Sequence, residues 1–129
     1  MYRLRKEFRF EASHQLMHHD GKCAQLHGHS WRGYLVVEGP DLVKTGPKQN
    51  MLIDYADIKV AIRSIEDALD HKHLNDVFKS DMPTSELVAR NIFDRVKIGK
   101  PDVNVRLSKV IIEETCTSRC EYEPDVQNK

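Results

Sequence analysis

The sequence predicts an α+β domain, built from an antiparallel sheet of four strands with two helices on one face of the sheet. Three segments alternate apolar and polar residues, which is typical of strands with one buried face. Between the second and the third, two segments repeat apolar residues every three or four positions, which is typical of amphipathic helices. The predicted order is strand, strand, helix, helix, strand, strand. The 129 residues fit a single domain over residues 1–129.

The first strand is predicted within EFRFEASHQL, residues 7–16, and the second over residues 27–37. In a strand every second side chain lies on the same face. The residues that share a face are Phe8, Phe10, Ala12, His14 and Leu16 in the first strand, and His27, His29, Trp31, Gly33, Leu35 and Val37 in the second. Both strands therefore place histidines on their apolar face. The next segment, EGPDLVKTGPKQN, contains two Gly and two Pro and predicts a loop.

The two helices are predicted within residues 51–71 and 82–97. Asp54 is the expected N-cap of the first, which should end near Leu69 to His71. Thr84, which follows a proline, is the expected N-cap of the second. Both positions suit residues whose side-chain oxygen can accept a hydrogen bond from the first turn.

The last part of the chain alternates again, with Val110, Ile112 and Glu114 on one face, and CTSRC at 116–120 predicts a turn into a short final strand. Glu114 is therefore expected to point toward the apolar face, where a carboxylate needs a partner. The guanidine-like edge of a ligand would serve, and so would a buried arginine.

Composition excludes several classes of protein. The 20 basic and 20 acidic side chains cancel and the pI is near 7.1, so the strongly basic surface of a nucleic-acid binder is absent. No apolar run approaches the roughly 20 residues of a membrane span, and the charged N-terminus is unlike a signal peptide. We therefore expect a cytoplasmic protein with no nucleic-acid or membrane partner. Its three cysteines should be reduced.

His14, His27 and His29 are the candidate metal ligands. His27 and His29 are two residues apart, so both imidazoles project from one face of a strand, and His14 comes from the apolar face of the neighbouring strand. Three imidazoles with one open position are the arrangement of a catalytic zinc site. The alternative is that these are ordinary surface or core histidines, which is the commoner outcome for any single histidine.

Cys23 lies four residues before His27 and has two possible roles. It could complete a closed zinc site with the three histidines, which would make the protein a structural zinc module. The paired cysteines of most structural zinc sites are missing, however, and a chain of this length can fold without a metal. A thiolate held beside the metal as a catalytic base is therefore favoured.

Asp70 and His71 are adjacent in LDHKHLND, at the expected end of the first helix. A carboxylate can orient an imidazole that exchanges protons with a substrate. Capping of the helix end is the alternative role for this pair.

Taken together, the motifs FEASH, CAQLHGHS, LIDYADIK, LDHKHLND, PTSELVARNIF and EETCTSRC resemble those of the 6-pyruvoyl-tetrahydropterin synthase family, in the same order. The likeness runs from about Phe8 to Tyr122. Three residues separate the cysteine from the HGH motif, as in the carboxy-forming branch of the family, whereas the pyruvoyl-forming branch resembles C-x5-HGH. The loop LVKTGPKQNML is a few residues longer than is usual in the family.

The resemblance implies a tunnelling fold (T-fold), in which three subunits close their sheets into a barrel and two trimers stack into a hexamer with active sites between subunits. It implies zinc on His14, His27 and His29, with Cys23 as the base, Asp70 and His71 as a proton relay, and Glu114 as the anchor of the pterin. The implied substrate is 7,8-dihydroneopterin triphosphate. The implied products are 6-carboxytetrahydropterin, acetaldehyde and triphosphate, an early step of queuosine biosynthesis. A pyruvoyl-forming enzyme and a zinc-stabilised binding module are the alternatives.

Overall fold

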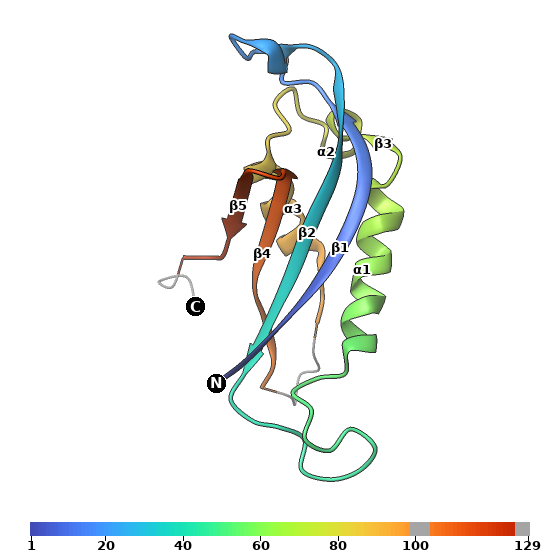
Figure 1. The fold of residues 1–129 in the computed structure, drawn as a ribbon, viewed down its shortest axis with the longest axis vertical. Coiled ribbons are helices and arrows are strands. Elements are labelled where there is room, and N and C mark those ends of the chain that lie inside the picture. The colour runs from blue at the N-terminus through green and yellow to red at the C-terminus, as the bar shows by residue number, and fades with distance from the viewer. Residues whose placement is uncertain (99–103, 126–129) are drawn as a thin grey trace.

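A computed structural model describes residues 1–98 and 104–125, and within them the predicted α+β fold is confirmed (Figure 1). The four predicted strands are β1 (Tyr2–His14), β2 (His27–Gly39), β4 (Arg106–Thr115) and β5 (Ser118–Tyr122). The two predicted helices are α1 (Tyr55–Leu69) and α3 (Ser85–Arg95). None of the helices in these ranges is long and apolar enough to cross a membrane.

The long antiparallel pair β1–β2 forms the centre of the sheet and gives the molecule two ends. The pair begins with Tyr2 opposite Gly39 and finishes with His14 opposite His27. We call the end with His14 and His27 the histidine end, and the end with Tyr2 and Gly39 the loop end. In Figure 1 the turn that joins β1 to β2 is at the top, and the loop that follows β2 is at the bottom. This turn contains η1 (Lys22–Ala24), a single turn of 3-10 helix.

The prediction of four antiparallel strands is wrong in one respect. A fifth strand, β3 (Lys72–His73), pairs parallel with β1, so the sheet is mixed and has the order β3-β1-β2-β4-β5. It leads into α2 (Leu74–Phe78), a short helix that was not predicted. The cause is a reversal at His71, whose φ is 59° and whose backbone N–H donates to the Glu11 carbonyl at 2.6 Å. This bond turns the chain after α1 back along β1.

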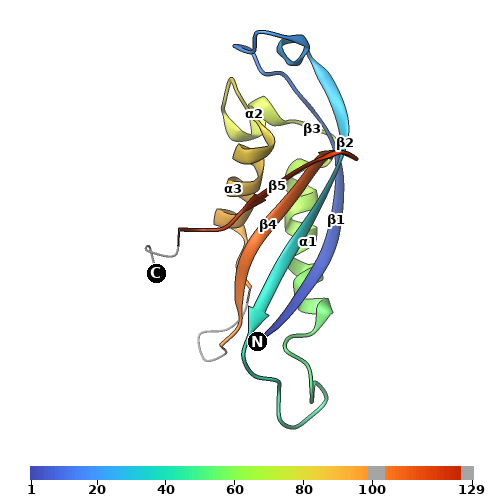
Figure 2. The same cartoon turned by 60° about the vertical axis from the view of Figure 1, so that its left-hand side comes forward.

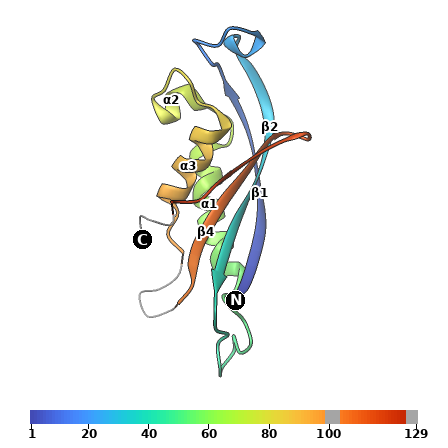
Figure 3. The same ribbon diagram turned by 90° about the vertical axis from the view of Figure 1, so that its left-hand side faces the viewer.

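Helices α1 and α3 cover the same face of the sheet, as predicted (Figures 2 and 3). The alternating positions of the strands supply the apolar side of this layer, and Trp31, Leu35 and Val110 are each at most 1% exposed. Both predicted N-caps are confirmed. The Asp54 carboxylate accepts from the Ala56 N–H at 2.9 Å, and the Thr84 hydroxyl accepts from the Leu87 N–H at 3.2 Å.

Candidate metal centre and active site

The three histidines meet at the histidine end of the sheet. His14 lies opposite His27 and Ala12 lies opposite His29, so the period of two in each strand brings all three rings to one face. The ring centroids are 4.5 Å apart for His14 and His27, 5.2 Å for His14 and His29, and 4.8 Å for His27 and His29. His14 is 1% exposed, which makes it the most deeply buried of the three.

Backbone carbonyls determine which ring nitrogen carries the hydrogen in two of these histidines. Nδ1 of His14 lies 2.8 Å from the carbonyl oxygen of Pro83, and Nδ1 of His27 lies 2.7 Å from that of Gln25. A carbonyl oxygen only accepts, so each Nδ1 carries the hydrogen. In the neutral ring Nε2 then has a free lone pair, and a partner on Nδ1 is what metal-binding histidines regularly have. Both tautomers therefore suit a metal ligand.

Glu114 of β4 reaches the same point. Its Oε1 lies 3.0 Å from Nε2 of His14 and 3.1 Å from Nε2 of His29. These contacts have the length of ion pairs, but neither Nε2 atom has a hydrogen bond of acceptable geometry, although both are buried. A lone pair that faces a carboxylate oxygen is repelled unless a cation lies between them. A proton or a metal ion is the cation that fits.

The pKa values of Glu114, His14 and His29 are shifted by burial and by their contacts with one another. The close contact with His14 holds the pKa of Glu114 below its usual value, although burial acts in the opposite direction. Burial alone would lower the pKa of His14, but Glu114 and the Pro83 carbonyl outweigh it and the pKa is raised. Burial dominates at His29 and lowers its pKa.

One ligand atom from each of His14, His27, His29 and Glu114 lies within 4.8 Å of the others, so this cluster could bind a metal ion. Three imidazole nitrogens and a carboxylate oxygen are a donor set that suits Zn²⁺. The buried Nε2 atoms without a hydrogen bond show that the residues fit the ion. The structure thus brings together the three predicted ligands, and it adds Glu114 to them.

The other predicted site residues lie outside this group of four. Cys23 is half-buried within η1. The Asp70 carboxylate lies 3.1 Å from Nδ1 of His71, and the His71 side chain is 80% exposed. Asp70 also accepts from the Glu11 N–H at 2.8 Å, and this bond holds its pKa below the usual value. The side chain of Asp70 is thus fixed against β1, and it orients an imidazole that faces outward.

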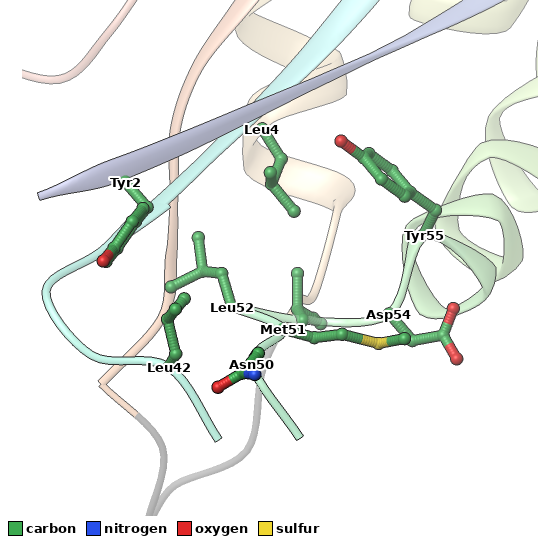
Figure 4. A pocket seen from close by; sticks show the side chains of 9 residues that line it. Tyr2, Leu4, Leu42, Asn50, Met51, Leu52, Asp54 and Tyr55 are labelled. Atoms are coloured by element: carbon green, nitrogen blue, oxygen red, sulfur yellow. The ribbon is translucent and has the colours of Figure 1, made fainter. Parts of the chain in front are cut away.

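A cavity of about 280 Å³ lies at the loop end (Figure 4). It is lined by Tyr2, Leu4, Leu42 and residues 50–55. Leu4 precedes His14 by ten residues, which in a strand is roughly 33 Å. The lining contains no histidine, lysine or arginine, and its one acidic residue, Asp54, caps α1. The long loop at 40–51 therefore lies far from the metal cluster of its own chain.

Two parts of the centre were missed by sequence reasoning. The carbonyls of Pro83 and Gln25 determine which nitrogen of His14 and His27 is free. Backbone carbonyls carry no residue-type signal, so nothing in the sequence pattern could have pointed to them. The approach of Glu114 to the histidines is the other part. Its parity placed it on the correct face, but the distance depends on how β4 pairs with β2.

Comparisons with known proteins identify the family. The sequence matches the 6-pyruvoyl tetrahydropterin synthase family over residues 3–125. It is 42% identical to a Synechocystis protein named 6-carboxy-5,6,7,8-tetrahydropterin synthase, with 95% of this chain and 93% of that protein covered. A Haemophilus influenzae protein of the same name is 35% identical, with 95% and 99% covered.

The fold comparison agrees with these matches. The structure of the Caenorhabditis elegans 6-pyruvoyl tetrahydropterin synthase superposes with a TM-score of 0.79 at 28% identity, and 96% of each chain is covered. The shared sheet and helices, the cluster of three histidines and the match over nearly the whole sequence lead to one conclusion: this chain belongs to the 6-pyruvoyl tetrahydropterin synthase family.

Proposed function

We propose that the protein is a 6-carboxy-5,6,7,8-tetrahydropterin synthase, a carbon–carbon lyase. It converts 7,8-dihydroneopterin triphosphate and water into 6-carboxytetrahydropterin, acetaldehyde and triphosphate, an early step of queuosine biosynthesis. Two relatives with this name match 95% of the chain at 42% and 35% identity, which supports the assignment. The observation that carries it is the group of His14, His27 and His29, each of which offers a ligand atom to one cluster.

His14, His27 and His29 would hold the metal, which we propose to be zinc. Zinc in an open three-histidine site polarises substrate oxygens and makes hydroxyl groups more acidic. The carbonyls of Pro83 and Gln25 hold the hydrogen on Nδ1 of His14 and His27, so that each ring can present Nε2 to the metal. These residues therefore bind and orient the side chain of the substrate.

The remaining roles follow from chemistry and position. The Cys23 thiolate is the base that takes a proton from the substrate carbon chain. His71, oriented by Asp70, exchanges protons on the other side of the substrate. Glu114 is already ionised and half-buried, so its carboxylate can accept two N–H bonds from the edge of the pterin ring. This role requires Glu114 to exchange its contacts with the histidines for contacts with the pterin.

Assembly into a hexamer of two stacked trimers is part of the proposal. Within the described residues β5 is an edge strand, and β3 covers only Ala12 and Ser13 of β1. Long uncovered edges favour pairing with other chains. His71 faces outward rather than toward the metal cluster of its own chain, which suits an active site shared between subunits. Sedimentation should show a hexamer, and a stable, active monomer at micromolar concentration would contradict it.

Product analysis tests the activity. Purified, zinc-loaded protein is incubated with 7,8-dihydroneopterin triphosphate, and the products are identified by mass. Acetaldehyde together with 6-carboxytetrahydropterin supports the proposal. Release of triphosphate without cleavage of a carbon–carbon bond would identify the protein as a pyruvoyl-forming enzyme instead. The similarity to the Caenorhabditis elegans synthase makes this the second candidate.

A further inference from the structure

Among the described residues, η1, the part of the turn that carries Cys23, has few hydrogen bonds to the strands, whereas Met17 of the same turn donates to the Asp81 carbonyl at 2.9 Å. Helix η1 contains no buried residue and has no side-chain cap. Two hydrogen bonds connect it to the strand end that follows His14. The Leu16 N–H donates to the Cys23 carbonyl at 2.9 Å, and the carboxamide Nε2 of Gln15 donates to the Ala24 carbonyl at 2.8 Å. Gln15 thus supplies the side-chain contact between this turn and β1.

Gln15 is itself held in place from the opposite side. The Asn75 carboxamide accepts from the Gln15 N–H at 2.9 Å and donates to the Gln15 carbonyl at 2.8 Å. The carboxamide thus provides one acceptor and one donor, as the backbone of a neighbouring strand would. These two bonds extend the parallel pairing of β3 with β1 beyond Ser13 and His73. The backbone of Gln15 is therefore fixed where β3 itself has ended.

The end of β1 and the two residues that follow it contact the Asp70–His71 pair, the metal cluster and the Cys23 turn. Glu11 binds both Asp70 and His71, and His14 contributes to the metal cluster. Gln15 and Leu16 then hold the Cys23 turn. Residues 11–16 are thus a common support, and a displacement of Gln15 would move Cys23 relative to the histidines.

We propose that Gln15 is a positioning residue for Cys23, and that Asn75 is the residue that holds Gln15. The inference rests on the proposed role of Cys23 as a base. The hydrogen bond of the Gln15 side chain goes to the Ala24 carbonyl, next to Cys23, and not to a metal ligand. It acts by fixing the distance between the thiol and the cluster, and a displacement of about 1 Å in a catalytic group can cost a hundredfold in rate.

Isosteric variants test the donated hydrogen bond. Gln15→Glu keeps the shape but has no hydrogen to donate to the Ala24 carbonyl, whereas Gln15→Lys keeps a donor. We expect Gln15→Glu to lower kcat at least about tenfold, with KM changed less than about twofold and zinc content unchanged. Gln15→Lys should retain more activity than Gln15→Glu, and Asn75→Asp should lower kcat in the same way. Gln49→Glu is the matched control, because Gln49 lies in the exposed loop at the other end.

A double-mutant cycle distinguishes positioning from a general loss of structure. In a Cys23→Ala background, Gln15→Glu should change the residual rate less than about twofold, because the group that it positions is gone. An equal loss in both backgrounds would overturn the proposal, as would zinc loss in Gln15→Glu or an unchanged kcat.

Amide hydrogen exchange makes the test independent of the proposed activity. Gln15→Glu should exchange about tenfold faster at Leu16 and over residues 22–25, while β4 exchanges as in the wild type. If the wild-type protein yields no acetaldehyde, the lyase assignment fails, but this measurement still decides whether Gln15 holds the turn. Unchanged exchange over the turn would refute the inference by itself.

Discussion

A glutamate lies at each end of the sheet, and the two have different partners. At the loop end, Glu38 is 7% exposed and accepts hydrogen bonds from the guanidinium groups of Arg3 and Arg106. At the histidine end, Glu114 faces Nε2 of His14 and His29, and these contacts are not hydrogen bonds of acceptable geometry. Guanidinium groups are permanently charged, whereas an imidazole is charged only when it is protonated.

The difference separates a structural carboxylate, Glu38, from Glu114, for which we propose a role in binding. Glu38 has its compensating charge within the chain, so nothing further needs to bind there. The carboxylate of Glu114 and the lone pairs of its histidines need a cation between them. A carboxylate in this position can exchange partners when a substrate binds. The partners of a carboxylate, rather than the extent of its burial, indicate whether a ligand binds there.

The largest expected effect comes from removing ligands at the histidine end. The double variant His27→Ala, His29→Ala should lose most of its zinc and at least about 10³-fold in rate, because several kcal/mol of transition-state stabilisation disappears with the ion. Added zinc should raise the Tm of the wild type but not that of the variant. Metal analysis and calorimetry check both results, and stoichiometric zinc in the variant would refute the ligand assignment.

Cys23→Ala is expected to separate metal binding from turnover. Three imidazoles remain, so zinc content should stay near that of the wild type, while loss of a general base lowers kcat by about 10²–10⁴-fold. If Cys23 were a fourth ligand instead, zinc would be lost and Zn–S distances near about 2.3 Å would appear in the wild type. Zinc content and kcat of the same preparation distinguish the two roles.

Glu114→Gln should affect substrate binding more than metal binding. The neutral amide cannot form the charge-assisted pair with the pterin edge, so KM should rise about tenfold to a hundredfold while zinc is retained. The short distances to His14 and His29 make a metal-ligand role the competing explanation. Loss of zinc from Glu114→Gln would favour that explanation, and titration with zinc measures it directly.

At both ends of the sheet, the features that follow from local rules could be predicted from the sequence. Local rules placed the histidines on the buried face, and they identified Asp54 and Thr84 as caps. These features depend on strand parity and on bonds within one turn of helix, which are visible in a short window of sequence. The loop at the other end was equally evident from its glycines and prolines.

Features that depend on distant contacts were not predictable. Strand β3 has only two residues, and it exists because His71 bonds to Glu11 of β1 and Asn75 bonds to Gln15, which follows β1, in each case some 60 residues away in the chain. Neither a parallel pairing of this length nor the left-handed conformation of His71 has a signature in a single sequence. The support of Cys23 by Gln15 belongs to the same class, because it joins a loop to a strand end.

Glu38→Gln tests the loop end and its dependence on pH. Burial alone would raise the pKa of Glu38, but Arg106 and Arg3 outweigh it and the pKa is lowered. Its contribution to stability is therefore present above the unfolded pKa of about 4.3 and is lost as pH falls through the lower folded value. At pH 7 the free energy of unfolding, measured by urea denaturation, should be about 1–2 kcal/mol lower in the variant than in the wild type. This difference should shrink below about pH 4. The kcat of the folded variant should match that of the wild type. A lower kcat would show that Glu38 contributes to activity, contrary to its purely structural role.

The smallest effect is expected at Lys48, also in the loop region. Its ammonium group lies 3.3 Å from the Asp54 carboxylate and 3.5 Å from that of Asp57, and the hydrogen bond with Asp54 raises the pKa of Lys48. The side chain is about half exposed, so solvent screens the attraction and the long chain loses freedom when it pairs. Lys48→Ala should therefore leave Tm unchanged within the error of calorimetry. Asp54→Ala is the informative comparison, because it removes the same ion pair together with the cap on Ala56, and it should lower Tm. Equal losses in both variants would show that a surface ion pair at this end stabilises the fold, contrary to the contrast drawn with Glu38.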